Sequence, residues 1–477
     1  MRSFPSASYS VTMRLSLRDR PGTFARVAAA VGKAGGSLGS VDLVSADGGH
    51  KIRDLSVLCA DEQQSRRVIS AVRRLAGVRI ISASDRTFLA HLGGKIEVTP
   101  RSPVKTRDDL SMLYTPGVGR VAMALYEDPS RAWNLTAKGH MVAVVSDGSA
   151  VLGLGDIGPH AALPMLEAKA VLFKSFAGLD AFPLALDVRD PRELVETVVR
   201  LSPGFGAVDL EDIASPLSAE VEAALSKRLD IPVLQGGLHG MAVVVTAAAL
   251  NSARLLGRSA SSLRTVIAGA GAAAASVASL LRSAGVRDVV CCDRTGALFA
   301  GRVENMNPLK ERLAQTTNPR RLRGDLAAAL KGAHLFVGLS SPGSVSAAEL
   351  RRMAKDALVF SLANPVPEVL PERVASFARV VATSRSDYPN QLDNALAFPG
   401  IFKGALAARA TRVDGRMLLA AARAVSSLVS DSELSEDYVV PSLFNPKAAD
   451  TVAAAVMRAA YETGAARPLD LPVEGRS

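Results

Sequence analysis

The stretch RTVIAGAGAAAASVASLL, residues 264–281, decides the fold of the C-terminal half of this chain. It places a strand-like run, the pattern Gly269-x-Gly271-x-x-Ala274 and an alanine-rich helix in that order. Glycines at such a turn let a pyrophosphate approach the N-terminus of the helix, where free N–H groups and the helix dipole favour an anion. The stretch therefore predicts the nucleotide-binding turn of a Rossmann-type domain.

An acidic residue after the next strand bears on which dinucleotide binds. Asp293 closes the run RDVVCCD, where a carboxylate can accept hydrogen bonds from a ribose diol. A carboxylate in this place repels a 2′-phosphate and favours NAD, whereas the adjacent Arg294 keeps NADP open as a cofactor. The structural alternative for the whole pattern is a turn of small residues that only packs a strand against a helix.

Strand-like and helical runs alternate through the rest of the C-terminal half. This alternation predicts an α/β fold with a doubly wound parallel sheet. We assign residues 254–477 to this domain, including a tail of alanine-rich helices from Phe398 that should pack back on residues 88–253. The strand-like runs are RTVIAGA, RDVVCCD, AHLFVGL, ALVFSLA and ARVVAT.

Residues 1–87 form a unit of their own. Four alternating runs and two amphipathic runs follow one another in the order β-α-β-β-α-β, which predicts a ferredoxin-like domain. With Asp19, Pro21 and Gly22 before the first helix, the unit resembles an ACT domain. The resemblance implies that a small effector, often an amino acid, binds where two such domains pair. A pairing module without a ligand is the alternative.

Composition excludes several classes of protein. Hydrophobic residues make up 48% of the 477 residues and charged residues 21%, which is typical of a folded chain with more than one domain. The net charge of +10 comes from Lys and Arg residues scattered among acids, and aromatic residues are only 4%. This balance argues against a nucleic-acid partner and would help to attract anionic substrates.

Cysteine use and hydropathy bear on the location of the protein. Cys59, Cys291 and Cys292 cannot build a disulfide framework and suit a reducing compartment. The first ten residues lack the apolar stretch of a secretory signal. The continuous apolar run Met241–Leu250 is too short to cross a bilayer. We therefore expect a cytoplasmic protein with no membrane partner.

Several long segments from residue 88 to the C-terminal tail resemble malic enzymes. The resemblance implies a malic enzyme N-terminal α/β domain over residues 88–253, followed by the NAD(P)-binding domain, in a layout similar to bacterial malic enzymes with an N-terminal ACT domain. It implies oxidative decarboxylation of malate, or of a malate-like 2-hydroxy acid, to pyruvate and CO2, in a homodimer or higher assembly. The segments are LSMLYTPGVGRVAMAL (110–125), VAVVSDGSAVLGLGDIGPHAALPMLEAKAVLFKSFAGLDAFPLALD (142–187), VDLEDIASP (208–216), ANPVPE (363–368) and SRSDYPNQLDNALAFPGIFKGAL (384–406).

The implied chemistry needs a base for the hydroxyl proton and an acid that reprotonates the enolate. The resemblance gives the base role to Lys169 and the acid role to Tyr114. Lys169 lies in an otherwise apolar stretch, and burial there should lower its pKa towards the useful range. The alternatives are a surface lysine on a helix and a half-buried turn tyrosine.

Four further residues match binding positions of the family. Glu211 and Asp212 match two acidic ligands of a divalent cation, and paired carboxylate oxygens suit Mg²⁺ or Mn²⁺. Asn364 and Asn394 match positions that hydrogen-bond the substrate carboxylate. Without the resemblance, a Glu-Asp pair at a strand end is usually a solvated turn.

The sequence departs from the family pattern at the metal site. The family carries two consecutive aspartates where this chain has Gly236 and Gly237, and the usual Asn-Asn is here Asp393-Asn394. Loss of anionic oxygen ligands weakens a Mg²⁺ site. Three readings remain: an enzyme with a weaker metal site, an enzyme for another 2-hydroxy acid, or a non-catalytic protein that binds a nucleotide or an effector.

Overall fold

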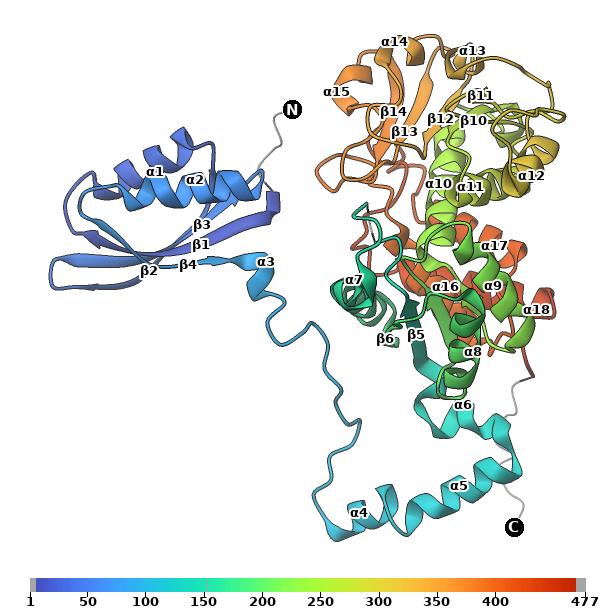
Figure 1. The fold of residues 1–477 in the computed structure, drawn as a ribbon, viewed down its shortest axis with the longest axis horizontal. Coiled ribbons are helices and arrows are strands. Elements are labelled where there is room, and N and C mark those ends of the chain that lie inside the picture. The colour runs from blue at the N-terminus through green and yellow to red at the C-terminus, as the bar shows by residue number, and fades with distance from the viewer. Residues whose placement is uncertain (1–5, 152, 469–477) are drawn as a thin grey trace. The chain divides into compact units, whose positions relative to one another are not determined.

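The computed structural model describes residues 6–151 and 153–468. The chain divides into two compact units, Met1–Thr99 and Pro100–Ser477. Figure 1 shows the path of the chain through both.

The first unit is an antiparallel sheet covered on one face by two helices (Figure 1). Alternate residues of its first strand, Val11, Met13, Leu15 and Leu17, are buried, as expected of a strand with one face on a core. The sheet order is β2-β3-β1-β4, and the order β-α-β-β-α-β is confirmed. The elements are β1 (Ser6–Arg18), α1 (Thr23–Lys33), β2 (Ser37–Asp47), β3 (His50–Cys59), α2 (Glu62–Arg73) and β4 (Val78–Asp85), followed by the short α3 (Arg86–Leu89).

The second unit contains two parallel sheets. The first sheet has the order β6-β5-β7-β8, and its strands are β5 (Met141–Ser146), β6 (Asp180–Ala185), β7 (Ala207–Leu210) and β8 (Val233–Leu234). From β5 the chain continues to β6 on one side of the sheet, and from β7 it continues to β8 on the other side. Because a parallel sheet opens a crevice where its strand order reverses, we expect one at the carboxyl ends of β5 and β7. The connecting helices are α7 (Gly158–Leu172), α8 (Pro191–Leu201) and α9 (Leu217–Arg228).

The second sheet is the predicted doubly wound sheet. Its order is β11-β10-β9-β12-β13-β14, parallel except for the short β11. The strand order reverses between β9 and β12. The strands are β9 (Arg264–Ala268), β10 (Asp288–Asp293), β11 (Gly296–Ala297), β12 (Leu335–Gly338), β13 (Ala357–Ser361) and β14 (Ala378–Thr383); the helices are α11 (Ala272–Ser283), α12 (Pro308–Thr316), α13 (Leu326–Leu330), α14 (Ala347–Leu350) and α15 (Pro371–Val374).

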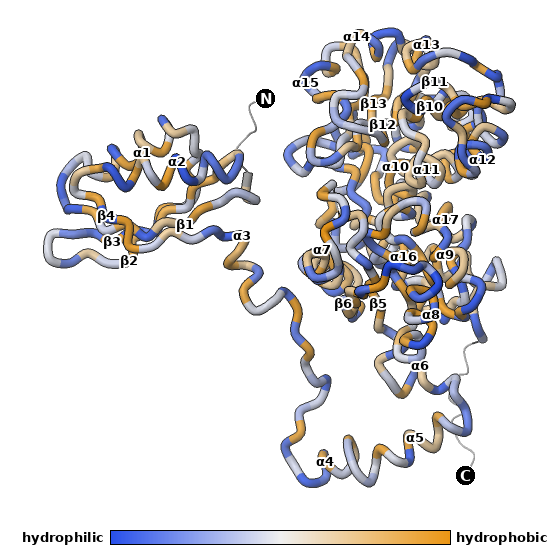
Figure 2. Tube along the Cα trace, viewed as in Figure 1, coloured by the Kyte–Doolittle hydropathy of each residue, from blue (hydrophilic) through white to orange (hydrophobic). Residues whose placement is uncertain are grey.

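The helix α10 (Gly236–Leu255) joins the two sheets and packs against α11. Among the described residues it is the one helix long and apolar enough to cross a membrane (Figure 2), but 67% of its apolar window is buried inside the protein. It is therefore the central core helix, and longer than the apolar run of the sequence suggested.

The C-terminal helices close the core. They are α16 (Phe398–Ala407), α17 (Gly415–Ser427) and α18 (Ala448–Glu462). Phe398 and Phe402 place their rings 4.9 and 5.2 Å from the ring of Phe173, which follows α7. The expected return of the tail onto the preceding region is confirmed.

One segment of the second unit has no core of its own. The helices α4 (Arg107–Leu113) and α5 (Gly117–Glu127), which we call the arm (residues 107–127), contain no buried residue. The short α6 (Ala132–Leu135) follows. Large apolar side chains of the arm are exposed, among them Met112, Met123 and Tyr126. Figure 1 shows the arm extending away from α7.

Candidate active site

The turn between β9 and α11 has the geometry of an anion-binding turn. Gly269 has φ 143°, and a Cβ on it would lie 2.4 Å from the carbonyl oxygen of Leu339. Only glycine fits there. Gly271 is the N-cap of α11, and a Cβ on it would meet no protein atom within 4 Å. Ala274 is buried against the sheet. The turn thus leaves open space in front of the free N–H groups of α11.

A buried glutamate that sequence reasoning missed joins the loops that follow β12 and β13. Glu368 accepts hydrogen bonds from the backbone N–H groups of Ser340 (2.8 Å) and Ala363 (3.0 Å) and from the hydroxyl of Ser361 (3.0 Å). It therefore holds together the loops after β12 and β13. Asn364 lies in the second of these loops and is exposed. The sequence pointed to a buried Glu368 only by placing an acidic residue within the otherwise apolar run PVPEVL.

Asp293 ends β10, but its carboxylate is already engaged. Arg302 Nη2 donates to both oxygens at 2.8 and 3.0 Å, Lys310 Nζ donates at 2.8 Å, and Asn305 and Thr295 donate as well. Burial acts to raise the pKa of Asp293, but the hydrogen bonds from Lys310 and Arg302 outweigh it and lower the pKa to about 2. A ribose diol would have to compete with these donors.

Lys169 lies on α7 and contacts Glu211, which directly follows β7 of the first sheet. Its ammonium is 2.8 Å from Oε1 of Glu211 and 3.9 Å from the centroid of the Phe398 ring. The expectation that burial lowers the pKa of Lys169 is wrong. Burial does act in that direction, but the negative charges of Glu211 and Asp209 outweigh it and raise the pKa. The ammonium is therefore the stable form in the free protein.

Asp209 is the second acid that sequence reasoning missed. It lies on β7 and is fully buried, and its Oδ1 accepts a hydrogen bond from the N–H of Gly236 at 2.7 Å. Burial, and then the negative charge of Glu211, raise the pKa of Asp209 well above its ordinary value. Its position two residues before Glu211 was the available signal, because alternate residues of a strand point to the same face.

The N-terminus of α10 completes this cluster. The N–H of Gly237 donates to Oε1 of Glu211 at 3.2 Å, and Nδ2 of Asn394 donates to the carbonyl oxygen of Gly237 at 3.3 Å. The fold thus brings together Lys169, Glu211 and Asn394 from segments far apart in the sequence.

The residues present do not fit a divalent cation. One oxygen of Glu211 is held by the ammonium of Lys169 and by the N–H of Gly237. Asp212 follows with a left-handed backbone, φ 53°. Within residues 6–151 and 153–468, no three His, Cys, Asp or Glu side chains form a group that could hold a metal ion. Among the described residues, no third His, Cys, Asp or Glu side chain thus joins Glu211 and Asp212 in such a group.

Tyr114 is not brought to Lys169 within one chain. It ends α4, and its side chain is 63% exposed. Figure 1 places α4 away from α7, which carries Lys169. Both helices belong to the unit Pro100–Ser477, so their separation does not depend on how the two units are placed.

The two candidate sites are linked through α10 and α11. Nδ1 of His239, on the first turn of α10, lies 3.3 Å from the hydroxyl of Ser276 on α11, and its Nε2 lies 2.9 Å from Glu222. The helix whose N-terminus meets Glu211 thus contacts the helix whose N-terminus forms the nucleotide turn.

Three family models match the chain. The malic enzyme N-terminal domain matches residues 93–226, the malic enzyme NAD-binding domain matches residues 238–461, and the ACT domain matches residues 5–82. The resemblance seen in the sequence motifs is confirmed.

Individual proteins match over most of their length. An NAD-dependent malic enzyme of Geobacillus stearothermophilus is 47% identical over 469 residues, 98% of either chain. A bifunctional malic/malolactic enzyme of Bacillus subtilis is 49% identical over 78% of this chain and 92% of its own. The crystal structure of an NAD-dependent malic enzyme from Thermotoga maritima is 41% identical, with a TM-score of 0.74 over 78% of this chain and 99% of that one.

Proposed function

Because this chain belongs to the malic enzyme family, we propose that it oxidises malate and decarboxylates it to pyruvate and CO2 with reduction of a nicotinamide dinucleotide. The observation that carries the proposal is the Lys169–Glu211 pair at the end of β7, linked through α10 and α11 to a turn at Gly271 that leaves room for a pyrophosphate. Similarity along nearly the whole length of a malic enzyme favours this reading over a non-catalytic regulator.

The first step needs a proton acceptor beside the substrate hydroxyl. We assign this role to Lys169 acting with Glu211, whose carboxylate lies 2.8 Å from the ammonium. Because Lys169 starts as the ammonium, the hydroxyl proton moves to the carboxylate of Glu211 in this pair, while the hydride on the same carbon would pass to the nicotinamide of a bound dinucleotide. The product is a β-keto acid, which loses CO2. The ammonium of Lys169 can then donate a hydrogen bond to the enolate oxygen.

The second step needs an acid for the enolate carbon, and we propose Tyr114 of a second copy. The single chain holds Tyr114 on the arm and exposed, and Figure 1 shows α4 away from α7, the helix that carries Lys169. The arm also leaves Met112, Val118, Met123 and Tyr126 exposed, and such a surface is expected to be covered by a partner. A homodimer whose arms reach the neighbouring sites would cover the arm and complete each site.

We propose that the amide side chains of Asn394 and Asn364 bind the substrate carboxylates. Nδ2 of Asn394 lies beside Gly237 at the N-terminus of α10, within the cluster that includes Glu211. Asn364 is exposed in the loop after β13, which Glu368 holds through the N–H of Ala363.

For the cofactor, we propose NAD, bound over Gly269, Gly271 and Ala274. The support is the open space at Gly271 and the carboxylate of Asp293 at the end of β10. Arg302 and Lys310 form ion pairs with that carboxylate, which neutralises their positive charges. Without this neutralisation both cations would favour the 2′-phosphate of NADP, so the preference for NAD depends on Asp293.

We propose that Gly237 stands where the family carries a metal ligand, and that this difference leaves the chain with weak affinity for Mg²⁺ or Mn²⁺. The support is the engagement of Glu211 by Lys169 and the room beside Gly237, where a Cβ would lie 3.5 Å from both oxygens of Glu211. None of the steps above is assigned to a metal ion.

For the N-terminal domain, we propose a small effector. Gly22 has φ 82° and precedes α1, and Asp19 on the same turn pairs with Lys51 at 2.8 Å. A thermal-shift screen of amino acids and central metabolites on the full chain and on residues 88–477 tests this assignment.

The experiment that tests the function is an assay of the purified chain with malate and NAD. Formation of reduced cofactor, pyruvate and CO2 in equal amounts is the expected result. Reduced cofactor without CO2 would indicate a plain 2-hydroxy acid dehydrogenase. No turnover with malate under any metal condition would contradict the proposal.

A further inference from the structure

Asp209 is a buried acid to which the steps above assign no role. It is fully buried, its Oδ1 accepts the N–H of Gly236, and its carboxyl group forms a side-chain hydrogen bond with Glu211. Burying a carboxyl group is costly unless it is hydrogen-bonded, and these two contacts join Asp209 to the N-terminus of α10 and to Glu211.

The strand β7 directs this acid to the site. Val208 and Leu210 belong to the core between β7, α8 and α9, whereas Ala207 belongs to the core beneath α7 and α10. Alternate residues share a face, so Asp209 and Glu211 both point to the side of Lys169. The raised pKa of Lys169 agrees, since the charges of Glu211 and Asp209 both contribute to it.

The carboxyl group of Asp209 also occupies the space of a side chain at position 236. A Cβ on Gly236 would lie 2.7 Å from Oδ1 and 3.0 Å from Oδ2 of Asp209, closer than real Cβ contacts. A Cβ on Gly237 would lie at an ordinary 3.5 Å from Glu211. Neither glycine has a positive φ, so the backbone does not demand glycine at either position. At position 236, glycine is required because the carboxyl group of Asp209 fills the space of a side chain.

We infer that Asp209 is a positioning residue of this site: its carboxyl group takes the place of a side chain at position 236, anchors the N-terminus of α10 and holds Glu211 against Lys169. Strand β7 therefore provides the carboxyl group at this place in the site, and a side chain at position 236 of α10 could not occupy the same space. The inference rests on the proposed function, because the pair that Asp209 positions is the pair assigned to the proton transfer.

The spatial part of the inference is tested by melting temperatures, without any activity. Gly236→Ala should lower the melting temperature by several degrees, whereas the matched control Gly237→Ala should leave it unchanged or raise it, because alanine favours a helix. When Asp209 is replaced by serine, Gly236→Ala should no longer lower the melting temperature. An equal cost of Gly236→Ala in both backgrounds would overturn the inference.

The positioning part is tested by turnover of malate in the full chain. Asp209→Ser should lower kcat at least ten-fold and leave NAD affinity unchanged. The double variant Asp209→Ser/Gly236→Asp, which returns a carboxyl group from the helix, should recover most of that loss. A folded double variant no faster than Asp209→Ser would overturn the role. A wild type inactive on malate would instead remove the proposed function, while the melting temperatures would still decide the spatial part.

Discussion

The ammonium of Lys169 lies 2.8 Å from Oε1 of Glu211, and each side chain is only 12% exposed. An ion pair removed from water in this way is costly to break on one side only, because the remaining charge stays buried. Substitution of either partner is therefore expected to affect stability as well as chemistry, and the kinetics of each variant have to be read beside its melting temperature.

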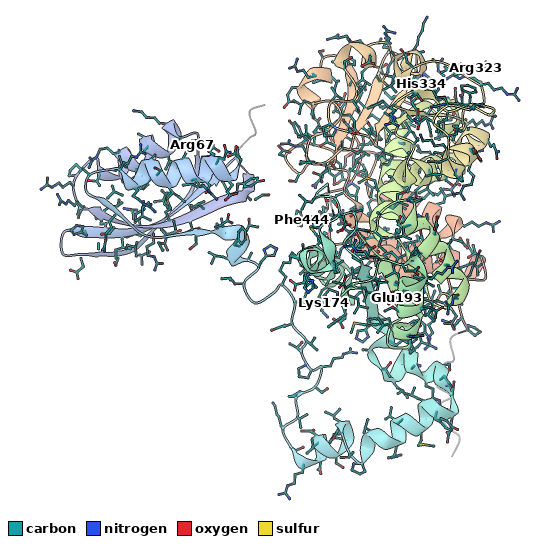
Figure 3. All side chains as sticks on the ribbon, viewed as in Figure 1. Arg67, Lys174, Glu193, Arg323, His334 and Phe444 are labelled. Carbon is teal, nitrogen blue, oxygen red and sulfur yellow. The ribbon has the colours of Figure 1, made fainter. Side chains whose placement is uncertain are left out.

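Replacing Lys169 with alanine should lower turnover of malate by about 10² or more, the usual contribution of a positioned general base. Affinity for NAD should not change. Lys174 provides a matched control, because it pairs with Asp180 at 2.6 Å yet is 63% exposed at the surface (Figure 3). Steady-state kinetics of Lys169→Ala and Lys174→Ala check this. Near-full activity of Lys169→Ala would remove its role.

Replacing Asp293 with serine should shift cofactor preference towards NADP. The substitution releases Arg302 and Lys310 from the carboxylate, and both cations then become available to a 2′-phosphate. We expect the NADP/NAD ratio of kcat/KM to rise at least about ten-fold, the worth of one charge-assisted contact. Adding Arg302→Ala should reverse part of the shift. An unchanged ratio would mean that other residues set the choice.

Asp293 should also give the protein a pH-dependent stability. Its pKa is lowered from 3.8 to about 2, so its contribution is fully present above its ordinary pKa and is lost as pH falls towards 2. The difference in free energy of unfolding between the wild type and Asp293→Asn should therefore shrink by about 2 kcal/mol from pH 6 to pH 2. Urea unfolding at a series of pH values measures it, and a difference independent of pH would contradict the assignment.

Much of the fold was predictable because its signals are local. The turn at Gly269 and Gly271, like the alternation of strands and helices, can be predicted from residues that are close together in the sequence. The direction of the Lys169 pKa was not predictable, because it depends on Glu211 and Asp209, which reach Lys169 only through strand β7. The clash between Asp209 and a side chain at Gly236 likewise joins residues from a strand and a distant helix.

The position of Tyr114 could not be predicted for a different reason. Its motif YTPGVG marks it by resemblance, but the motif says nothing of which chain the tyrosine serves. The exposure of the arm in the single chain is what supports our proposal that the tyrosine acts in the site of a second copy.

A carboxylate added at position 237 should strengthen metal binding. A side chain there has room, and its Cβ would lie 3.5 Å from both oxygens of Glu211, whereas position 236 is occupied by Asp209. Gly237→Asp should therefore bind Mn²⁺ about ten-fold more tightly than the wild type, because an anionic oxygen ligand is added. Gly237→Asn is the neutral control, and calorimetry is the measurement. Tight Mn²⁺ binding by the wild type, with no gain in Gly237→Asp, would show that Gly237 is not the missing ligand.

The central claim is that Lys169 of one chain and Tyr114 of another complete each site. Mixing Lys169→Ala with Tyr114→Phe after dissociation and reassociation tests it most directly. Each variant alone should be nearly inactive. Random pairing makes half of the dimers mixed, each with one intact site, so malate turnover should recover to about a quarter of the wild-type value. No recovery in a mixture shown to contain mixed dimers would contradict the claim, because it would mean that both residues must come from the same chain.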